Sequence, residues 1–471
     1  MEERGKLSRR SFLQFSAAVA AGALVVACQP AKPPAAQATP TTAEKKVEVA
    51  TTAPKPAGVT TEIVLWWGSG ADLAKKLEDS TNTDAKWAKW LIDAFEARNA
   101  GVKVKCEDHG WDEPLRTGLL TAIAGGNVPE VTIGEAFVHE FATLGAFAPV
   151  DVDKDAFPWG CIAGSYMDGK IYGVPAFTSS FALEINKKVV ADSGLDPTKI
   201  PASWDELLNN SKKIYDAGAQ GKNWFGFTVY GPTPTRTYGA VLRAMPWINR
   251  TGGLLGDDAG TKAAFNDDRA VQAYELLRAL FKFCDPGVSL SEHEEKVGGA
   301  LWDNKSAYQM SAVWDCYSAK RLKADTLYAG APICPSGCNR SNVVLGNLTF
   351  SPLAKAKNVA LGAKWCEFLA EDESEWQIAK IRGSVLPTTK KILQDPTLPK
   401  QLGYQGLETE MTAHIEILLN EDLRPVPPFA KNPSKIWSLW SDVFGKILLG
   451  TDPIKPILDK MQSDVEALLK G

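Results

Sequence analysis

The sequence predicts an α/β protein of two domains, for three reasons. A chain of 471 residues is too long for a single hydrophobic core. From residue 61 onward, short strand-like runs alternate with longer runs of helical period. The first of these runs follow the order strand, helix, strand at the spacing of a βαβ unit. We therefore expect a mainly parallel sheet with helices on both of its faces.

Residues 1–27 are expected to be an export signal and not part of the fold. Four basic residues precede an Ala-rich apolar run, Phe12 to Ala27, which is short for a membrane span. Ser8-Arg9-Arg10-Ser11-Phe12-Leu13 resembles the twin-arginine export motif. Val25-Val26-Ala27-Cys28 resembles a bacterial lipobox, which implies cleavage before Cys28 and a lipid on its sulfur. The alternative is a soluble exported protein in which this cysteine is incidental.

Residues 28–59 are predicted to be a disordered linker, because they are rich in Pro, Ala, Thr and Lys and offer almost nothing large to bury. With a lipid at Cys28, this segment would tether the body in the periplasm or at the outer face of the cytoplasmic membrane. The formal net charge of −4 and the lack of a basic stripe in the sequence argue against a nucleic-acid partner.

The cysteine pattern leaves the disulfides open. Seven cysteines follow Cys28, and this odd number leaves at least one unpaired within the chain. Cys334-Pro-Ser-Gly-Cys338 has the turn residues for a local bridge and is the pair that we favour. The four histidines are scattered, so we expect no metal site, and we expect no cofactor.

The elements of the body follow from periodicity and turn residues. Strands are expected at residues 62–67, 102–106 and 128–133, with helices at 84–99 and 115–124 between them. Further strands are expected at 224–230 and 343–351, and further helices at 236–247, 270–283 and 357–371. Ser203 and Glu206 have the spacing of a capping box at the start of another helix.

A hairpin is predicted at residues 166–172, since Asp168-Gly169 supplies the positive φ of a short turn. Pro175 cannot donate to a ladder, so the chain should bend or run along a sheet edge there. A strand at 181–185 then ends at polar residues. This pattern is compatible with a segment that leaves one domain and enters another.

Several motifs resemble the extracellular solute-binding proteins that deliver sugars to ABC importers. The sequence is similar to that family at Ala122-Ile-Ala-Gly-Gly-Asn-Val-Pro-Glu-Val131, Asp168-Gly-Lys-Ile-Tyr-Gly-Val-Pro175, Pro201-Ala-Ser-Trp-Asp-Glu-Leu207, Ser311-Ala-Val-Trp314 and Arg382-Gly-Ser-Val-Leu-Pro387. It departs from the family where Glu130 replaces the usual Asp, and where Asn304 and Ala312 replace Gly.

The resemblance implies a two-lobe periplasmic-binding-protein-like fold with crossover hinge strands. Lobe 1 would comprise residues 60–185 and 333–388, and lobe 2 residues 186–332 and 389–471. The implied function is capture of a mono- or oligosaccharide between the lobes by hinge closure, followed by delivery to a membrane permease. The protein would act as a monomer and reach the membrane only through its lipid anchor.

A sugar needs flat aromatic surfaces for its C–H faces and paired donors and acceptors for its hydroxyls. One of Trp66 and Trp67 should face the cleft, because they end the first strand, where open α/β sheets place ligands. Trp437 competes with Trp440 for a C-terminal stacking role. The candidate ligand-binding residues are Trp66, Trp67, Trp111, Glu135, Ser179, Ser180, Arg236, Trp302, Trp314, Asn347, Arg382 and Trp437.

Three other functions were weighed against carbohydrate binding. A polyol, a glycerol phosphate or another small polar solute would be favoured as the ligand if two arginines converged. A glycan-active enzyme would need a carboxylate pair, and the sequence contains no Gly-x-Ser-x-Gly, phosphate loop or dinucleotide fingerprint. A structural surface lipoprotein explains the surplus of aromatic residues less well. We therefore expect a binding protein and not an enzyme.

Overall fold

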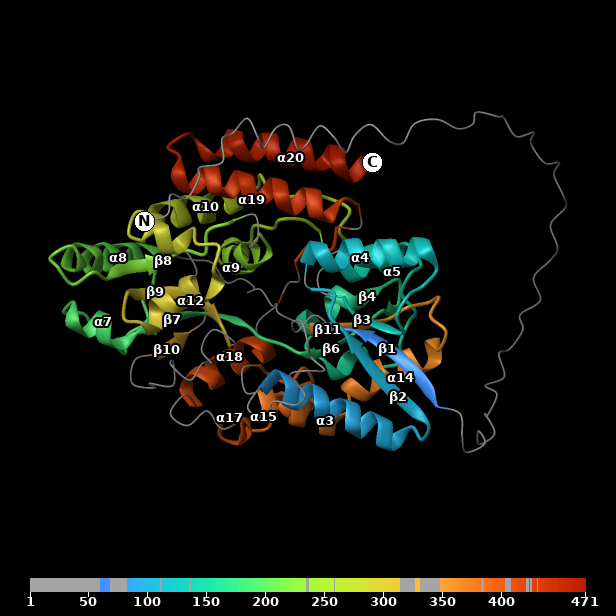
Figure 1. Cartoon of the computed structure of the whole chain (residues 1–471). Coiled ribbons are helices and arrows are strands. Elements are labelled where there is room, and N and C mark those ends of the chain that lie inside the picture. Colours follow the sequence, from blue (N-terminus) through green and yellow to red (C-terminus); the bar gives the residue numbers. More distant parts are fainter. Residues whose placement is uncertain are drawn as a thin grey trace, which may run out of the picture. The chain divides into compact units, whose positions relative to one another are not determined.

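The two-lobe α/β fold is confirmed by the computed structural model (Figure 1), which holds two sheets with separate hydrophobic cores. The structure describes residues 60–67, 83–110, 112–134, 137–233, 237–257, 259–313, 327–330, 348–382, 385–402, 408–420, 423, 426–429 and 431–471.

The first sheet has the strand order β2-β1-β3-β11-β6. Its strands are β1 (Thr61–Trp66), β2 (Val102–Glu107), β3 (Val131–Ile133), β6 (Val174–Phe177) and β11 (Leu348–Pro352). β1 pairs in parallel with β2 and β3, as the βαβ pattern predicts, whereas β11 runs antiparallel to β3 and β6. The mainly parallel sheet expected from the sequence is therefore corrected to a mixed one, because β11 comes back from the other lobe. Pro175 lies in β6, which is an edge strand as predicted.

The second sheet has the strand order β10-β7-β9-β8. Its strands are β7 (Phe181–Asn186), β8 (Phe225–Thr228), β9 (Ser306–Ala312) and β10 (Leu327–Gly330). β8 pairs in parallel with β9, and the other two pairs are antiparallel. The predicted hairpin is present as β4 (Tyr166–Met167) and β5 (Lys170–Ile171), with φ of 51° at Asp168 and 79° at Gly169.

The helices of the first lobe surround a core rich in tryptophan and phenylalanine. They are α3 (Thr83–Arg98), α4 (Asp112–Gly125), α5 (Val138–Thr143), α6 (Trp159–Ile162), α14 (Val359–Leu369), α15 (Asp372–Arg382), α16 (Lys390–Leu393), α17 (Leu398–Gln401) and α18 (Glu408–Asn420). Glu130, which replaces the Asp usual at this place, accepts hydrogen bonds from the Val64 N–H at 2.7 Å and from Asn358 at 3.2 Å. Its longer side chain therefore ties β1 to the start of α14.

The helices of the second lobe include a C-terminal pair, α19 and α20, that lies side by side (Figure 1). They are α7 (Lys187–Asp192), α8 (Trp204–Gly218), α9 (Thr237–Arg250), α10 (Asp268–Phe281), α11 (Pro286–Ser289), α12 (Glu294–Trp302), α19 (Pro433–Leu449) and α20 (Ile454–Lys470). The Ser203 hydroxyl caps α8 as predicted, accepting from the Glu206 N–H at 3.1 Å. The Glu206 carboxylate accepts from the Ala202 N–H, one residue earlier than a capping box requires.

The chain crosses between the lobes at three places. Residues 178–180 join β6 to β7, and the segment from β10 to β11 makes the return. The third crossing lies between Leu423, in the first core, and Val426, in the second. α16, α17 and α18 pack their hydrophobic side chains into the first core, and the lobe bounds expected from the sequence stay a prediction. These helices are short, and their periodicity says nothing about which core they join.

Candidate functional site

The ends of β1 and β2 carry a stacked pair of rings, Trp66 on His109, with centroids 3.6 Å apart and planes inclined by 18°. Trp66 is only 8% exposed and packs against α4, where a Cβ at Gly118 would lie 3.6 Å from the indole. The His109 side chain remains 34% exposed, and its Nε2 lies 3.4 Å from Glu107 Oε2. The first lobe thus presents an imidazole, backed by an indole, at the edge where α/β sheets place ligands.

Glu107 gives this edge a negative charge. Hydrogen bonding to Lys105, and secondarily to His109, holds the pKa of the Glu107 carboxyl below its ordinary value. A carboxylate next to an aromatic stack can accept hydrogen bonds from adjacent hydroxyls of a ligand.

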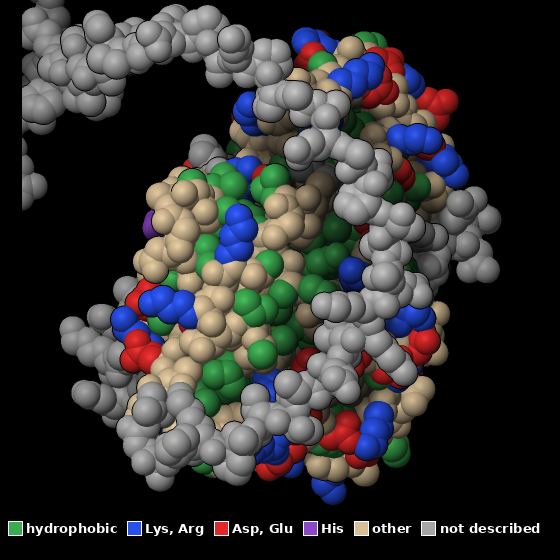
Figure 2. Space-filling view, turned by 90° about the vertical axis from the view of Figure 1, so that its right-hand side faces the viewer, with side chains coloured by type: hydrophobic (Ala, Val, Ile, Leu, Met, Phe, Trp, Pro, Cys, Tyr) green, Lys and Arg blue, Asp and Glu red, His purple; other side chains and the backbone are tan. Residues whose placement is uncertain are grey.

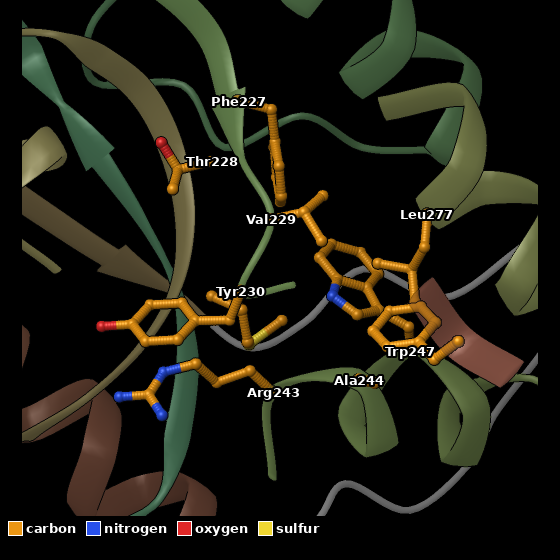
Figure 3. A pocket seen from close by; sticks show the side chains of 10 residues that line it. Phe227, Thr228, Val229, Tyr230, Arg243, Ala244, Trp247 and Leu277 are labelled. Atoms are coloured by element: carbon orange, nitrogen blue, oxygen red, sulfur yellow. The ribbon is translucent and has the colours of Figure 1, made fainter. Parts of the chain in front are cut away.

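The second lobe carries a cation at the corresponding edge (Figure 3). The Arg243 guanidinium carbon lies 3.7 Å from the centroid of the Tyr230 ring and 5.6 Å from that of Phe181. Phe181 opens β7, Tyr230 follows the end of β8, and Arg243 comes from α9, so three elements converge here. Arg243 Nη1 also donates to the Gly239 carbonyl at 3.2 Å. Stacking of a guanidinium on a tyrosine ring is favourable, and more so where water is excluded.

A pocket of about 220 Å³, opening to solvent included, adjoins this pair. It is lined by Phe227, Thr228, Val229, Tyr230, Arg243, Ala244, Trp247, Leu277, Met310 and Phe444. Figure 3 shows Val229, Trp247 and Leu277 at one side, and the Tyr230 ring over the Arg243 side chain at the other. The volume is below the usual range of ligand pockets, so this space alone suits one small substituent and not an oligosaccharide.

Trp302 belongs to the same edge. A Cβ on Gly298 of α12 would lie 2.9 Å from the Tyr230 hydroxyl and 3.0 Å from the Trp302 ring. Glycine at this position therefore lets the two aromatic side chains meet. Trp302 is 7% exposed. Of the residues selected from the sequence, it is the one that the structure brings to the Tyr230–Arg243 pair.

The first crossing holds Ser179 and Ser180, and both are fully buried. The Ser179 hydroxyl accepts from the Val313 N–H at 2.8 Å and lies 3.0 Å from the Ser180 carbonyl. Ser180 Oγ lies 2.9 Å from both Nδ1 and the carbonyl oxygen of His414. Both hydroxyls have protein partners, so a ligand would have to displace one, and their ligand role stays a prediction.

Two other predicted tryptophans lie inside the cores. Trp67 is fully buried, with Trp87 at 4.6 Å and Phe350 at 5.0 Å between ring centroids. Trp437 is 6% exposed and packs against Phe429 at 5.5 Å. Its competitor Trp440 donates from Nε1 to the Tyr274 hydroxyl at 2.8 Å. Their positions suit packing, and a ligand role for Trp67 or Trp437 stays a prediction.

Several predictions fall outside the described residues. These are the ligand roles of Trp111, Glu135, Arg236, Trp314 and Asn347, the side chain of Arg382 at the end of α15, the lipid at Cys28, and the Cys334–Cys338 bridge. The four described cysteines, Cys106, Cys161, Cys284 and Cys366, are free thiols.

His109, Tyr230 and Arg243 were missed by sequence reasoning. Tyr230 and Arg243 are 13 residues apart and meet only because β8 and α9 pack together. The sequence did contain a signal for His109. It lies just after the end of β2, and Trp66 lies at the end of the neighbouring strand β1. The rule that open sheets bind ligands at their strand ends applies equally to both.

The described surface carries both hydrophobic and charged side chains. Figure 2 shows a face on which hydrophobic side chains gather between margins that carry both basic and acidic ones. In the part of the chain that the structure describes, no helix has the length and apolar character needed to cross a membrane. The same residues contain no group of three or more His, Cys, Asp or Glu arranged to hold a metal ion.

Two family models match the sequence. The model described as bacterial extracellular solute-binding protein matches residues 78–376. The model of the twin-arginine translocation pathway signal sequence matches residues 6–26, which confirms the predicted twin-arginine motif.

Curated relatives match most of the chain at low identity. A binding protein of Brucella abortus is 25% identical over 389 residues, covering 80% of this chain and 88% of its own. The galactooligosaccharide-binding protein of Bacillus subtilis is 21% identical, and the match covers 81% of this chain and 86% of its own. The sn-glycerol-3-phosphate-binding periplasmic protein UgpB of B. abortus is 28% identical over a shorter stretch, 41% of this chain and 40% of its own.

Solved structures share the fold. An ABC transporter solute-binding protein from Thermotoga lettingae, bound with α-D-tagatose, aligns with a TM-score of 0.69 at 19% identity, covering 87% of this chain and 100% of its own. The cyclic α-maltosyl-1,6-maltose binding protein from Arthrobacter globiformis aligns with a TM-score of 0.70 at 19% identity. The alignment covers 87% of this chain and 99% of its own.

Proposed function

Because this chain belongs to the family of bacterial extracellular solute-binding proteins, we propose that it captures a carbohydrate between its lobes and delivers it to the permease of an ABC-type importer. Members of this family bind substrates and do not transform them. The expectation of a binding protein is therefore confirmed at the level of the family.

The observation that carries the carbohydrate proposal is that both lobes place aromatic rings at the ends of their strands. Trp66 and His109 stack at the edge of the first sheet, Phe181 and Tyr230 lie at the edge of the second, and the Trp302 ring of α12 lies beside Gly298, as does the Tyr230 hydroxyl. Pyranose rings present C–H faces that pack on such surfaces. The Glu107 carboxylate and the Arg243 guanidinium would then pair with hydroxyls at the rim of the sugar.

Closure of the lobes on the ligand would take place at the three crossings. Hinge motion needs only a few residues that absorb a change in φ and ψ. Residues 178–180 are a short connection of this kind between the two cores. A ligand that contacts both lobes shifts the equilibrium toward the closed form by as much as it prefers that form.

The twin-arginine signal and the family together indicate export to the periplasm or the cell surface. We further propose a lipid on Cys28, supported by the lipobox-like Val25-Val26-Ala27-Cys28, and a monomeric protein that the segment 29–59 tethers to the membrane. Replacement of Cys28 by Ser should release the protein from washed membranes into the soluble fraction. Retention of the Cys28→Ser protein on membranes would count against the lipid.

A second candidate ligand is a glycerol phosphate or another acidic polyol. Arg243, buried at the edge of the second lobe, favours it, and so does the relative that binds sn-glycerol 3-phosphate. A guanidinium can bind a phosphate with two parallel hydrogen bonds. The two candidates predict losses of affinity of different size when the charge of Arg243 is removed.

The test is a thermal-shift and calorimetric screen of the chain without residues 1–27 against maltose, maltotriose, β-galactobiose, tagatose and sn-glycerol 3-phosphate. A ligand at 100 times its Kd should add about 2.7 kcal/mol to the free energy of unfolding. A sugar that binds and is recovered unchanged supports the carbohydrate proposal, and a consumed sugar would make the protein an enzyme. A screen in which no sugar binds would contradict the proposal.

Two variants then locate the site. His109→Ala should weaken sugar binding on the order of tenfold, since aromatic contacts of this kind contribute about 1–3 kcal/mol. His293→Ala, which removes an exposed histidine at the start of α12, is the matched control. Arg243→Gln should abolish binding of sn-glycerol 3-phosphate but weaken binding of a neutral sugar only several-fold.

A further inference from the structure

We propose that Gly298 of α12 is a positioning residue that determines which ligands the second lobe binds. The place that a side chain would take at Gly298 is filled by the Tyr230 hydroxyl and the Trp302 ring. Through the Tyr230 ring, Gly298 also fixes the position of the Arg243 guanidinium. The part of this proposal that concerns ligand affinity rests on the proposed function, and the part that concerns the side-chain positions does not.

α12 contains two adjacent glycines, and the space beside them differs. Glycine inside a helix is less favourable than alanine, so each of the two lowers the stability of α12. A Cβ at Gly299 would lie 3.6 Å from Asp303 Oδ2, which is an ordinary van der Waals distance. A Cβ at Gly298 would lie 2.9 Å from the Tyr230 hydroxyl and 3.0 Å from Trp302 Cζ3. A side chain therefore fits at Gly299, but at Gly298 it requires that its neighbours move.

α12 cannot shift away to make this room without breaking other contacts. Its last turn is held to β7, because Asn186 Nδ2 donates to the Leu301 carbonyl at 2.5 Å. The same amide donates to Asn304 Oδ1, just after the helix, at 2.9 Å. Val297 and Leu301 are fully buried. A shift of α12 would lengthen these hydrogen bonds and open space around two buried side chains, and both changes are unfavourable.

The backbone on both sides of Tyr230 is held as well. The N–H of the preceding residue donates to Cys284 Sγ at 3.4 Å, and the N–H of the following residue donates to the Ser289 carbonyl at 3.0 Å. The Tyr230 hydroxyl, in contrast, is the far end of a side chain and can move by rotation about side-chain bonds. The same is true of the outer edge of the Trp302 ring. A side chain at Gly298 would therefore displace the two rings and not the backbone.

Movement of the Tyr230 ring would reach the cation of the second lobe. The Arg243 guanidinium carbon lies 3.7 Å from the centroid of this ring, and Figure 3 shows the ring over the Arg243 side chain. Arg243 is only 3% exposed. In a densely packed interior, a ring that moves by a few tenths of an ångström changes the position of the group stacked on it. The absence of a side chain at Gly298 thus determines where a ligand would meet the guanidinium.

The consequence is a preference among ligands. A phosphate that binds a guanidinium through two parallel hydrogen bonds depends strongly on geometry. A neutral sugar that packs on the rings of Tyr230 and Trp302 depends on contact area, which changes more gradually with position. Gly298→Ala should therefore weaken the binding of sn-glycerol 3-phosphate more than the binding of a neutral sugar.

The first test needs no ligand and uses a matched control in the same helix. Gly298→Ala and Gly299→Ala both replace a helical glycine by alanine, so the gain from helix propensity is the same in the two variants. We expect the urea midpoint of Gly299→Ala to lie above that of the wild type. The midpoint of Gly298→Ala should lie at or below the wild-type value, because the contacts become too close. An equal rise in both variants would overturn the proposal.

The second test asks whether the Tyr230 hydroxyl causes this loss. Tyr230→Phe removes the hydroxyl, which is the atom nearest to the place of the Cβ at Gly298, and keeps the ring. In a double-mutant cycle, Gly298→Ala should change the urea midpoint clearly less in Tyr230→Phe than in the wild type. Part of the effect should remain, because the Trp302 ring is still present. The same change in both backgrounds would show that Gly298 does not position Tyr230.

The third test measures the position of the cation, again without a ligand. Spectra of the arginine Nε–H groups report on nearby aromatic rings, and the Arg243 signal can be assigned by its loss in Arg243→Gln. Gly298→Ala should shift this signal, whereas Gly299→Ala should leave it in place. An unshifted Arg243 signal in Gly298→Ala would overturn the link between Gly298 and the guanidinium.

The fourth test measures affinity with whichever of maltose, β-galactobiose and sn-glycerol 3-phosphate binds. Gly298→Ala should raise the Kd on the order of tenfold for sn-glycerol 3-phosphate and several-fold for a neutral sugar. Gly299→Ala should keep the wild-type Kd. A wild-type Kd in Gly298→Ala would overturn its role in binding. If none of the three binds, the proposed function fails, and the first three tests still decide whether Gly298 positions Tyr230 and Arg243.

Discussion

The first crossing ends near a buried glutamate in each lobe, and the two carboxyl groups are held in different ways. In the first lobe, Glu375 accepts four hydrogen bonds of 2.6–3.1 Å from the N–H groups and hydroxyls of Thr388 and Thr389. Thr388 also bonds to the carbonyl of Pro175 in β6. In the second lobe, Glu184 faces the imidazole of His414. One carboxyl is held by neutral donors, the other by a base.

The comparison teaches that neutral hydrogen bonds do not compensate fully for burial. Burial raises the pKa of Glu375 to about 7, despite the opposing effect of all four hydrogen bonds. Glu375 therefore gains or loses its proton alone, near neutral pH. Glu184 instead lies 3.4 Å from a ring nitrogen of His414, a side chain that comes from a distant part of the sequence. The carboxyl of the first lobe thus depends on short-range donors, and that of the second lobe on the packing of α18 against β7.

The largest expected effect comes from removing the partner of Glu184. His414→Leu would leave a buried carboxyl without its imidazole and should lower the free energy of unfolding by about 3–5 kcal/mol. Urea denaturation at pH 7.5 measures this. Glu184→Gln, which keeps the shape and can still hydrogen-bond, should cost clearly less. Equal losses for the two variants would show that the pair contributes by packing alone.

A smaller effect, but one that depends on pH, is expected at Glu375. Its pKa in the fold lies above the ordinary 4.5, so the folded protein binds this proton more tightly than the unfolded chain does. The stabilisation is fully present below pH 4.5 and is lost as pH rises through about 7. Glu375→Gln should remove this dependence, which amounts to about 2–4 kcal/mol. Denaturant melts of both proteins between pH 4.5 and 9 would measure it.

The direction in which stability changes with pH is the control for the prediction about Glu375. The difference in stability, variant minus wild type, should rise with pH and level off above about pH 8. A difference that stays constant, or that falls as pH rises, would contradict the assigned role of Glu375.

Removing one hydroxyl beside either glutamate should lower the free energy of unfolding less, and by different amounts at the two places. Ser180→Ala removes the buried hydroxyl that lies 2.9 Å from both Nδ1 and the carbonyl oxygen of His414, and should cost about 1–3 kcal/mol. Thr389→Val removes one of four donors to a carboxyl that keeps three, and should cost about 1 kcal/mol. Equilibrium denaturation of both variants at pH 6 compares them. A larger loss of stability in Thr389→Val than in Ser180→Ala would contradict this prediction.

The smallest effect is expected from the loss of a helix cap, which serves as a control for the other variants. Ser203→Ala removes the cap of α8, far along the chain from the crossing, and should cost about 1 kcal/mol. It should leave hydrogen exchange at residues 174–186 as in the wild type. Faster exchange there in Ser203→Ala would mean that general loss of stability, and not the loss of a specific bond, loosens the crossing.

Local chemistry predicted much of the fold. The turn at Asp168-Gly169, the edge position of Pro175 and the cap at Ser203 each depend on a few neighbouring residues, and all three are confirmed. The direction of β11 was not predicted, because it depends on the path by which the chain returns to the first sheet. α16, α17 and α18 are amphipathic segments that either core could accommodate.

The site was harder to predict for the same reason. Trp66 could be selected because it stands at the end of a strand, but its partner His109 and the pair of Tyr230 and Arg243 meet only in three dimensions. Ser180 and His414 are 234 residues apart in the sequence. A histidine with no nearby ligand residue has no local signature of its role, and composition alone suggested none for His414.

The place of β11 in the first sheet has a consequence for the growing chain on the ribosome. β11 lies between β3 and β6, yet it is made only after both strands and after the whole second sheet. Until residue 352 has been synthesised, β3 is unpaired on one side and β6 has no partner strand, so each exposes the edge that β11 will later cover, with hydrophobic residues such as Ile133 and Val174 beside it. Unpaired strand edges in partly folded chains promote aggregation. The nascent protein must therefore protect two open edges while about 170 further residues, 178–347, are added.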